Sequence, residues 1–186
     1  MAFNIPNILT LARVIAAPFV ALAFLIFERP VADIVAFVVF FIASLTDYVD
    51  GWLARKWDQV SGFGRMLDPI ADKAMVAVTG AVLLGLYEMA PLVVIPVVVI
   101  LMRETLVSGL REYLKGARIL DVTLMAKWKT TVQMLAMGVL LVAEAIGPSV
   151  VTLGLVLLWI AAALTAITGW DYFSKGLAYI NAEEET

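Results

Sequence analysis

Hydrophobic residues fill six long runs of the chain, and charged residues gather in the short stretches between these runs. A helix of about 20 residues crosses the hydrocarbon core of a bilayer, and each run reaches that length once its flanking residues are included. The pattern therefore predicts an all-α integral membrane protein with six transmembrane helices in a single domain, residues 1–186. The expected spans are residues 8–27, 31–50, 68–87, 91–110, 127–146 and 150–174.

Two segments outside these spans have patterns of their own. Residues 3–12 mix polar and apolar positions and predict a short interfacial helix that leads into the first span. Residues 180–186 include the consecutive acids Glu183, Glu184 and Glu185, and we expect a solvated, disordered acidic tail there.

Composition supports the membrane interpretation and limits the chemistry. Hydrophobic residues make up 63% of the chain, against roughly 45–50% in soluble domains, so a soluble globular fold is excluded. The sequence contains no cysteine and no histidine, which excludes disulfides, thiolate metal sites and an imidazole base. Carboxylates must therefore carry any metal or proton chemistry.

The distribution of basic residues predicts the orientation in the membrane. Clusters of Lys and Arg follow the second and fourth spans, and Arg29 is the single basic residue on the other side. Because basic residues favour the cytoplasmic side, we expect both termini and both charged connections in the cytoplasm. The net charge of −3 does not indicate a nucleic-acid partner, and we expect none.

The most informative stretch joins the second and third spans. At 100° per residue, two aspartates and two small residues of the second helix lie within about 60° of arc, and a glycine and two aspartates of the third lie within about 80°. These residues are Asp47, Asp50, Gly51 and Ala54 on the second helix, and Gly64, Asp68 and Asp72 on the third. Four carboxylates can therefore converge between two neighbouring helices.

Four aspartates at this depth need compensation. Each Asp near the bilayer centre costs roughly 2.5–3.5 kcal/mol on insertion scales, and neighbouring carboxylates also repel one another. One or two divalent cations would offset both effects, and hard oxygen ligands without His or Cys suit Mg²⁺ or Mn²⁺. Because Mg²⁺ binds carboxylates together with substrate phosphates, the pattern also predicts a phosphate-bearing ligand.

Each of these residues also has a simpler structural explanation. Small residues are favoured where helices pack closely in lipid. Asp68 could cap a helix that starts at Pro69, and Asp50 could pair with Arg55 at the membrane surface. Caps and surface pairs do not, however, account for four aspartates on facing stripes of two membrane helices.

Eight positions of this stretch fit the signature D-x-x-D-G-x-x-A-R-x(8)-G-x-x-x-D-x-x-x-D. The chain therefore resembles the CDP-alcohol phosphatidyltransferases. The positions are Asp47, Asp50, Gly51, Ala54, Arg55, Gly64, Asp68 and Asp72. The resemblance implies six transmembrane helices, a homodimer, and a site for two metal ions, Mg²⁺ or Mn²⁺, near the cytoplasmic face of the bacterial inner membrane.

The resemblance also implies roles for individual residues. The implied metal ligands are Asp47, Asp50, Asp68 and Asp72. Asp72 is implied as the catalytic base as well. The residues implied to bind CDP-diacylglycerol are Asp47, Asp50, Gly51, Ala54, Arg55 and Gly64.

Three further stretches, at residues 4–13, 103–112 and 126–134, are similar to those of family members that use glycerol 3-phosphate as acceptor. The implied reaction is attack of a glycerol 3-phosphate hydroxyl on the lipid-bearing phosphate of CDP-diacylglycerol, with release of CMP. We expect membrane lipids to surround the chain as its solvent.

The acceptor phosphate requires basic residues beside the metals. Arg103 and Arg111 lie about two helical turns apart and share a face of the fourth span, and Lys127 opens the fifth; we expect these three to bind the glycerol phosphate. We interpret Lys115, Arg118 and Lys129 as anchors at the membrane surface. Lipid-facing surface, bundle core or interface belt is the interpretation for Trp57, Trp128, Trp159, Trp170 and Tyr172.

Two other functions fit parts of the pattern. Another transferase of the family, of the cardiolipin, phosphatidylinositol phosphate or phosphatidylserine type, would use the same acidic signature. A divalent-cation transporter would also place aspartates inside the membrane, but beyond Asp47 and Asp72 the second and third spans are nearly all apolar, except for Asp33 and Thr79. A polar site that ends within the bilayer favours catalysis over transport.

Overall fold

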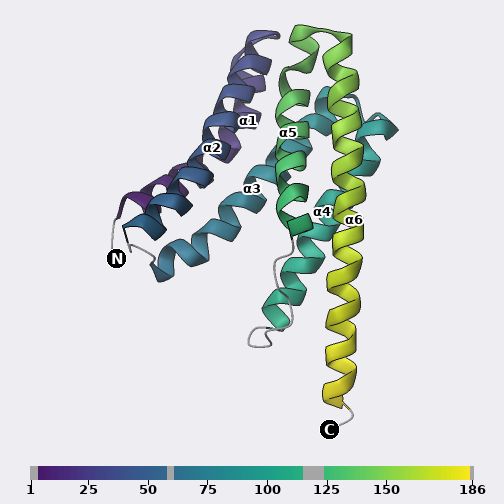
Figure 1. Ribbon diagram of the computed structural model, residues 1–186. Helices are drawn as coiled ribbons and strands as arrows, with labels where there is room; N and C mark the ends of the chain where they lie inside the picture. The colour runs from purple at the N-terminus through teal and green to yellow at the C-terminus, as the bar shows by residue number, and fades with distance from the viewer. Residues whose placement is uncertain (1–3, 58–60, 115–123, 185–186) are drawn as a thin grey trace.

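The computed structural model describes the backbone of residues 4–57, 61–114 and 124–184, without the side chains of residues 6, 48, 50–55, 124–127, 183 and 184. Within these ranges the chain forms six helices and no strand (Figure 1), which confirms the all-α fold class. The helices are α1 (Ile5–Ile26), α2 (Val31–Lys56), α3 (Gly62–Leu86), α4 (Pro91–Tyr113), α5 (Leu124–Ile146) and α6 (Pro148–Glu184).

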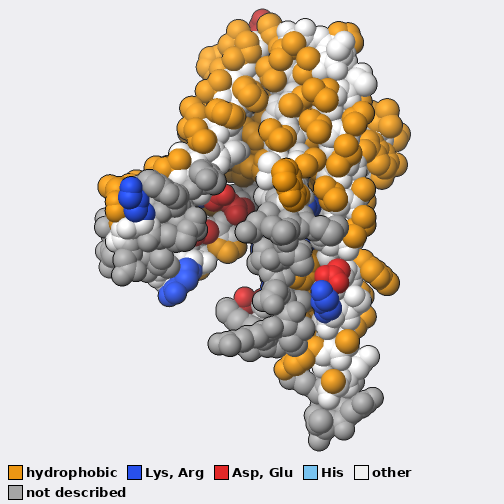
Figure 2. All heavy atoms as spheres, viewed as in Figure 1, with side chains coloured by type: hydrophobic (Ala, Val, Ile, Leu, Met, Phe, Trp, Pro, Cys, Tyr) orange, Lys and Arg blue, Asp and Glu red, His pale blue; other side chains and the backbone are white. Residues whose placement is uncertain are grey.

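Successive helices run in opposite directions, and the chain begins at the lower end of α1 and ends at the lower end of α6 in the view (Figure 1). Every helix except α2 is long and apolar enough in its described residues to cross a membrane, and α2 itself has 26 residues. Hydrophobic side chains cover the upper part of the visible surface, whereas most visible charged side chains lie lower (Figure 2). The chain therefore has the organisation of a multi-pass membrane protein.

The place of residues 3–12 at the membrane interface stays a prediction; from Ile5 onward they are helical and, rather than forming a separate helix, make up the first turns of α1. Asn4 caps this helix, and its side chain accepts a hydrogen bond from the backbone nitrogen of Asn7 at 3.0 Å. A capped start favours a helix, and α1 continues through Pro18 to Ile26 without a break.

Helix α3 begins well before the expected residue 68. Ser61 is its cap, and the Ser61 hydroxyl accepts a hydrogen bond from the backbone nitrogen of Gly64 at 2.9 Å. Asp68 and Pro69 therefore lie inside the helix, and the explanation of Asp68 as a helix cap is wrong. The signature residues of α3 are consequently carried on one continuous helix.

Helix α6 continues beyond the expected end at residue 174 and reaches Glu184. The disordered tail expected at residues 180–186 is thus helical as far as the structure describes it. An ion pair between Lys175 and Asp171, 2.8 Å apart and one turn from each other, supports the last part of the helix, and Ala and Glu are strong helix formers.

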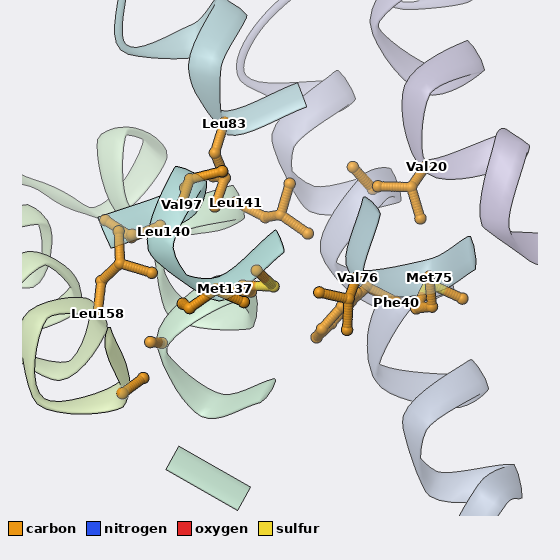
Figure 3. Packing of buried hydrophobic residues seen from close by; sticks show 14 of the residues in the cluster. Val20, Phe40, Met75, Val76, Leu83, Val97, Met137, Leu140, Leu141 and Leu158 are labelled. Carbon is orange, nitrogen blue, oxygen red and sulfur yellow. The ribbon is translucent and has the colours of Figure 1, made fainter. Parts of the chain in front are cut away.

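Buried hydrophobic side chains from all six helices form one core. Phe40, Met75 and Val76 gather at one side of this cluster, and Leu140 and Leu158 lie at the other (Figure 3). Because lipid tails are as apolar as the core, close packing rather than exclusion from water holds membrane helices together. Small residues at the contacts therefore decide how well the helices fit.

A buried acid, Asp33 of α2, is compensated at the end of the bundle opposite the chain termini. The Nε of Arg29 donates to Asp33 Oδ1 at 2.8 Å, and Arg29 Nη1 contacts Glu144 Oε2 of α5 at 2.7 Å. The hydrogen bond to Asp33 raises the pKa of Arg29 above its ordinary value. The ion pairs of Arg29 join α2 to α5. They account for the isolated position of Arg29, so Arg29 needs no role at the aspartates of the signature.

The contact between α5 and α6 generates a prediction. A Cβ at Gly154 would lie 2.6 Å from Leu140 Cδ2, whereas a Cβ at Gly109 has no atom within 4 Å. We expect Gly154→Ala to reduce the free energy of unfolding by about 1–2 kcal/mol, because overpacking outweighs the gain in helix propensity. Gly109→Ala should instead leave thermal stability in detergent unchanged or higher. Equal melting temperatures for the two variants would contradict the described packing.

Candidate active site

Helix α1 carries a stripe of buried polar residues. Asn7, Thr10 and Arg13 are each at most 5% exposed, and their spacing of three residues places them on one side of the helix. Helix α1 packs against both α2 and α3. The polar stripe therefore faces the helices that carry the signature aspartates.

Arg13 joins two of these aspartates. Its Nη1 contacts Oδ1 of Asp47 on α2 and Oδ1 of Asp72 on α3, the second at 2.7 Å. The Arg13 side chain is 2% exposed, whereas those of Asp47 and Asp72 are 49% and 56% exposed. A buried cation thus draws together carboxylates from two helices and offsets their mutual repulsion.

The other residues of the stripe hold α3 in place. Thr10 Oγ1 donates to Asp68 Oδ1 at 2.9 Å, and Ser61 Oγ donates to Asn7 Oδ1 at 2.8 Å. A Cβ at Gly64 would lie 2.7 Å from the same Asn7 oxygen. Gly64 therefore has the close-packing role that small residues take between membrane helices, and its role in binding the donor stays a prediction.

The aspartates are accessible. Figure 2 shows acidic side chains in a recess beside the lower parts of the helices. The described residues do not by themselves contain a group of three acids close enough to share a metal ion. The side chains of Asp50, Gly51, Ala54 and Arg55 lie outside the described residues, so the complete ligand set stays a prediction, and the backbone places these four residues on α2.

The donor set nevertheless fits a divalent cation. Asp47 and Asp72 already direct one carboxylate oxygen each at a single positively charged nitrogen. Half-exposed carboxylate oxygens converging from two helices are the hard ligands that Mg²⁺ and Mn²⁺ prefer. The arrangement suits a cation bound between α2 and α3.

A second cluster of charges lies on α4 and α5. Arg103 Nη1 contacts Glu104 Oε1 at 3.2 Å, and Lys129 Nζ contacts the same carboxylate oxygen. Lys129 is 3% exposed, so its interpretation as a membrane-surface anchor is wrong. A buried ammonium requires a partner, and Glu104 supplies it.

Arg103 and Arg111 are brought together by a residue of α6. Their guanidinium carbons lie 5.6 Å and 5.0 Å from the centre of the Tyr172 ring, and Arg111 Nη2 donates to Tyr172 Oη at 3.1 Å. The structure thus unites two of the three residues expected to bind the acceptor phosphate. The side chain of the third, Lys127, lies outside the described residues.

One contact connects the two clusters. Lys73 follows Asp72 on α3, and its Nζ donates to Ser108 Oγ of α4. Ser108 lies one helical turn from both Glu104 and Arg111. The basic cluster and the aspartates therefore belong to neighbouring parts of the same end of the bundle.

Sequence comparison decides the family. Residues 3–167 match the CDP-alcohol phosphatidyltransferase family. The chain belongs to this family. The match covers the polar stripe of α1 and all eight positions of the acidic pattern.

Several curated relatives share nearly the full length of the chain and carry the name CDP-diacylglycerol–glycerol-3-phosphate 3-phosphatidyltransferase. The relative from Cereibacter sphaeroides is 46% identical, covering 99% of this chain and 100% of its own. The Rickettsia bellii relative is 45% identical, covering 95% and 97%. The Bacillus subtilis relative is 37% identical, covering 93% and 95%.

The bridge made by Arg13 generates a prediction for this family member. Replacing Arg13 with Met removes the cation shared by Asp47 and Asp72 and leaves two repelling carboxylates. Because these carboxylates are half exposed, we expect a loss of about 1–3 kcal/mol, below the 3–5 kcal/mol typical of a fully buried pair. Thermal unfolding in detergent with a chelator present measures the effect.

The matched control for this experiment is Arg65→Met, since Arg65 is an exposed cation on α3. We expect its melting temperature to stay close to that of the unchanged protein. If Arg13→Met and Arg65→Met unfolded at the same temperature, Arg13 would not stabilise the site.

Proposed function

We propose that this protein transfers the phosphatidyl group of CDP-diacylglycerol to glycerol 3-phosphate, giving phosphatidylglycerophosphate and CMP. The observation that carries the proposal is the convergence of Asp47 and Asp72 from two helices on one positive charge. The name shared by relatives of nearly full length supports the choice of donor and acceptor.

In this proposal the four signature aspartates hold two divalent cations, Mg²⁺ or Mn²⁺. Asp47, Asp50 and Asp68 are ligands, and Asp72 completes the second set. Such ions neutralise the charge of a diphosphate and lower the pKa of a nearby hydroxyl. Positioning and charge neutralisation account for most of the catalysis of phosphoryl transfer.

The other chemical roles in the transfer are assigned to individual residues. A hydroxyl oxygen of glycerol 3-phosphate forms a bond to the lipid-bearing phosphorus as the bond from that phosphorus to the oxygen of CMP breaks. Asp72 accepts the hydroxyl proton, and CMP leaves with the electron pair of the broken bond. In this proposal Gly51, Ala54 and Gly64 bind the cytidine diphosphate moiety, and Arg55 neutralises the diphosphate or steadies the aspartate ligands.

The basic cluster is assigned to the acceptor. Arg103 and Arg111 bind the phosphate of glycerol 3-phosphate, with Lys127 at the start of α5. Their proximity at Tyr172 and the planar geometry of guanidinium groups suit multidentate binding of a phosphate. The proposal places this site at the cytoplasmic face of the bacterial inner membrane and includes a homodimer.

The acceptor can be identified directly. We expect purified protein with CDP-diacylglycerol and Mg²⁺ or Mn²⁺ to release CMP when glycerol 3-phosphate is added, and far less with inositol phosphate, phosphatidylglycerol or serine. EDTA should reduce the release to background, and renewed divalent cation should restore it, because carboxylates alone cannot neutralise a diphosphate. Release no greater with glycerol 3-phosphate than with buffer would refute the proposed acceptor.

The base can be tested by one substitution. Asp72→Asn preserves the shape of the side chain but removes its ability to accept the proton, so we expect kcat to fall by about 10²–10⁴-fold, as for loss of a general base. The matched control is Asp171→Asn on α6, where Asp171 pairs with Lys175 away from the signature. Full activity of Asp72→Asn, with unchanged unfolding behaviour, would exclude Asp72 as the base.

A further inference from the structure

We propose that Tyr172 is a positioning residue that fixes Arg103 and Arg111 as a pair for a phosphomonoester, with Gly169 providing the space that Arg103 occupies. This inference rests on the proposed function and concerns the acceptor class. Tyr172 was expected only as a residue of the lipid-facing surface, the core or the interface belt, and no signature position lies on α6.

Both arginines lie close to the Tyr172 ring. Both guanidinium carbons lie 5.0–5.6 Å from the ring centre, within the range of about 6 Å over which an aromatic face attracts a cation. Arg111 also donates to the phenol oxygen at 3.1 Å. The Tyr172 side chain is buried at 2% exposure, so the surrounding helices determine where this ring holds the two cations.

Helix α6 leaves space for the Arg103 side chain at Gly169. A Cβ at Gly169, one turn from Tyr172 on α6, would lie 2.8 Å from Arg103 Cγ. Within the described residues, Arg103 Nε is buried without a hydrogen-bond partner. Packing against α6, the Tyr172 ring and the contact with Glu104 therefore fix this guanidinium, rather than hydrogen bonds from Nε.

The cluster around Tyr172 has an excess of positive charge. Arg103 and Lys129 share the carboxylate of Glu104, and Arg111 lies with Arg103 at the Tyr172 ring, so the charged residues joined by these contacts are three cations and one carboxylate. A phosphomonoester carries about −1.5 to −2 charges at neutral pH and so balances the excess. A neutral alcohol does not. The cluster therefore favours acceptors that carry a terminal phosphate, and the paired guanidinium groups are its recognition element.

The test compares the KM values of the two substrates. We expect Tyr172→Leu to raise KM for glycerol 3-phosphate by about tenfold, the scale of a lost desolvated cation–π pair, with KM for CDP-diacylglycerol unchanged. Tyr172→Phe keeps the ring and should restore most of the affinity, losing only the contact of Arg111 with the hydroxyl. Gly169→Ala should raise the same KM, because its Cβ displaces Arg103.

Two control variants distinguish a positioning role of Tyr172 from a general effect on helix packing. Trp159 is another aromatic residue of α6 that contacts α4, with its indole nitrogen 3.0 Å from the Leu92 carbonyl oxygen, and Trp159→Leu should leave both KM values unchanged. Gly154→Ala crowds Leu140 instead of an arginine and should lower stability without raising KM for glycerol 3-phosphate.

A second readout does not depend on turnover. Inorganic phosphate should raise the melting temperature of the unchanged protein and of Trp159→Leu, because a bound ligand stabilises the folded state, but not that of Tyr172→Leu. If the unchanged protein does not use glycerol 3-phosphate, the proposed function fails. If it does, and Tyr172→Leu shifts both KM values equally, neither of them, or kcat alone, the positioning role of Tyr172 is refuted.

Discussion

Charge compensation of carboxylates inside an apolar bundle is the constraint on which the rest of this structure depends. Asp47 and Asp72 belong to different helices, and Arg13 of a third helix contacts both. Because a lone carboxylate or guanidinium is costly in lipid, the three helices are stable in this arrangement only together. The packing of α1 on α2 and α3 is therefore also the packing of the site.

In the second cluster a buried cation, rather than a carboxylate, is the charge that needs compensation. Lys129 of α5 is buried, Glu104 of α4 compensates it, and Arg103 shares that carboxylate. Tyr172 adds an aromatic face for the guanidinium groups. The clustered acids Asp47, Asp68 and Asp72 thus lie on α2 and α3, whereas the clustered bases Arg103, Arg111 and Lys129 lie on α4 and α5. Lys73 of α3 contacts Ser108 of α4 between the two groups. A reaction between a diphosphate and a phosphorylated alcohol needs both kinds of surface side by side.

Hydropathy predicted the six helices because long apolar runs separated by charges permit few other folds in lipid. The spacing of the aspartates predicted that carboxylates of α2 and α3 converge, and among the described side chains Asp47 and Asp72 both contact Arg13 of α1, which packs against both helices. The positions of Arg13 and Lys129 were not predicted, because counting basic residues for orientation treats every Lys and Arg as an anchor. A signal for Arg13 was present: Asn7, Thr10 and Arg13 recur every third residue in an otherwise apolar helix. The partnership of Lys129 with Glu104 joins residues of different helices, which periodicity within one helix cannot reveal.

The buried position of Arg13 has a consequence for biogenesis. Ribosomal synthesis releases α1 before α2 and α3, so the guanidinium reaches the bilayer before either of its carboxylate partners exists there. Until α2 and α3 follow, this side chain has no carboxylate partner and reaches water by extending toward the membrane surface. The charges at this end of the bundle are therefore balanced only when all three helices are in place.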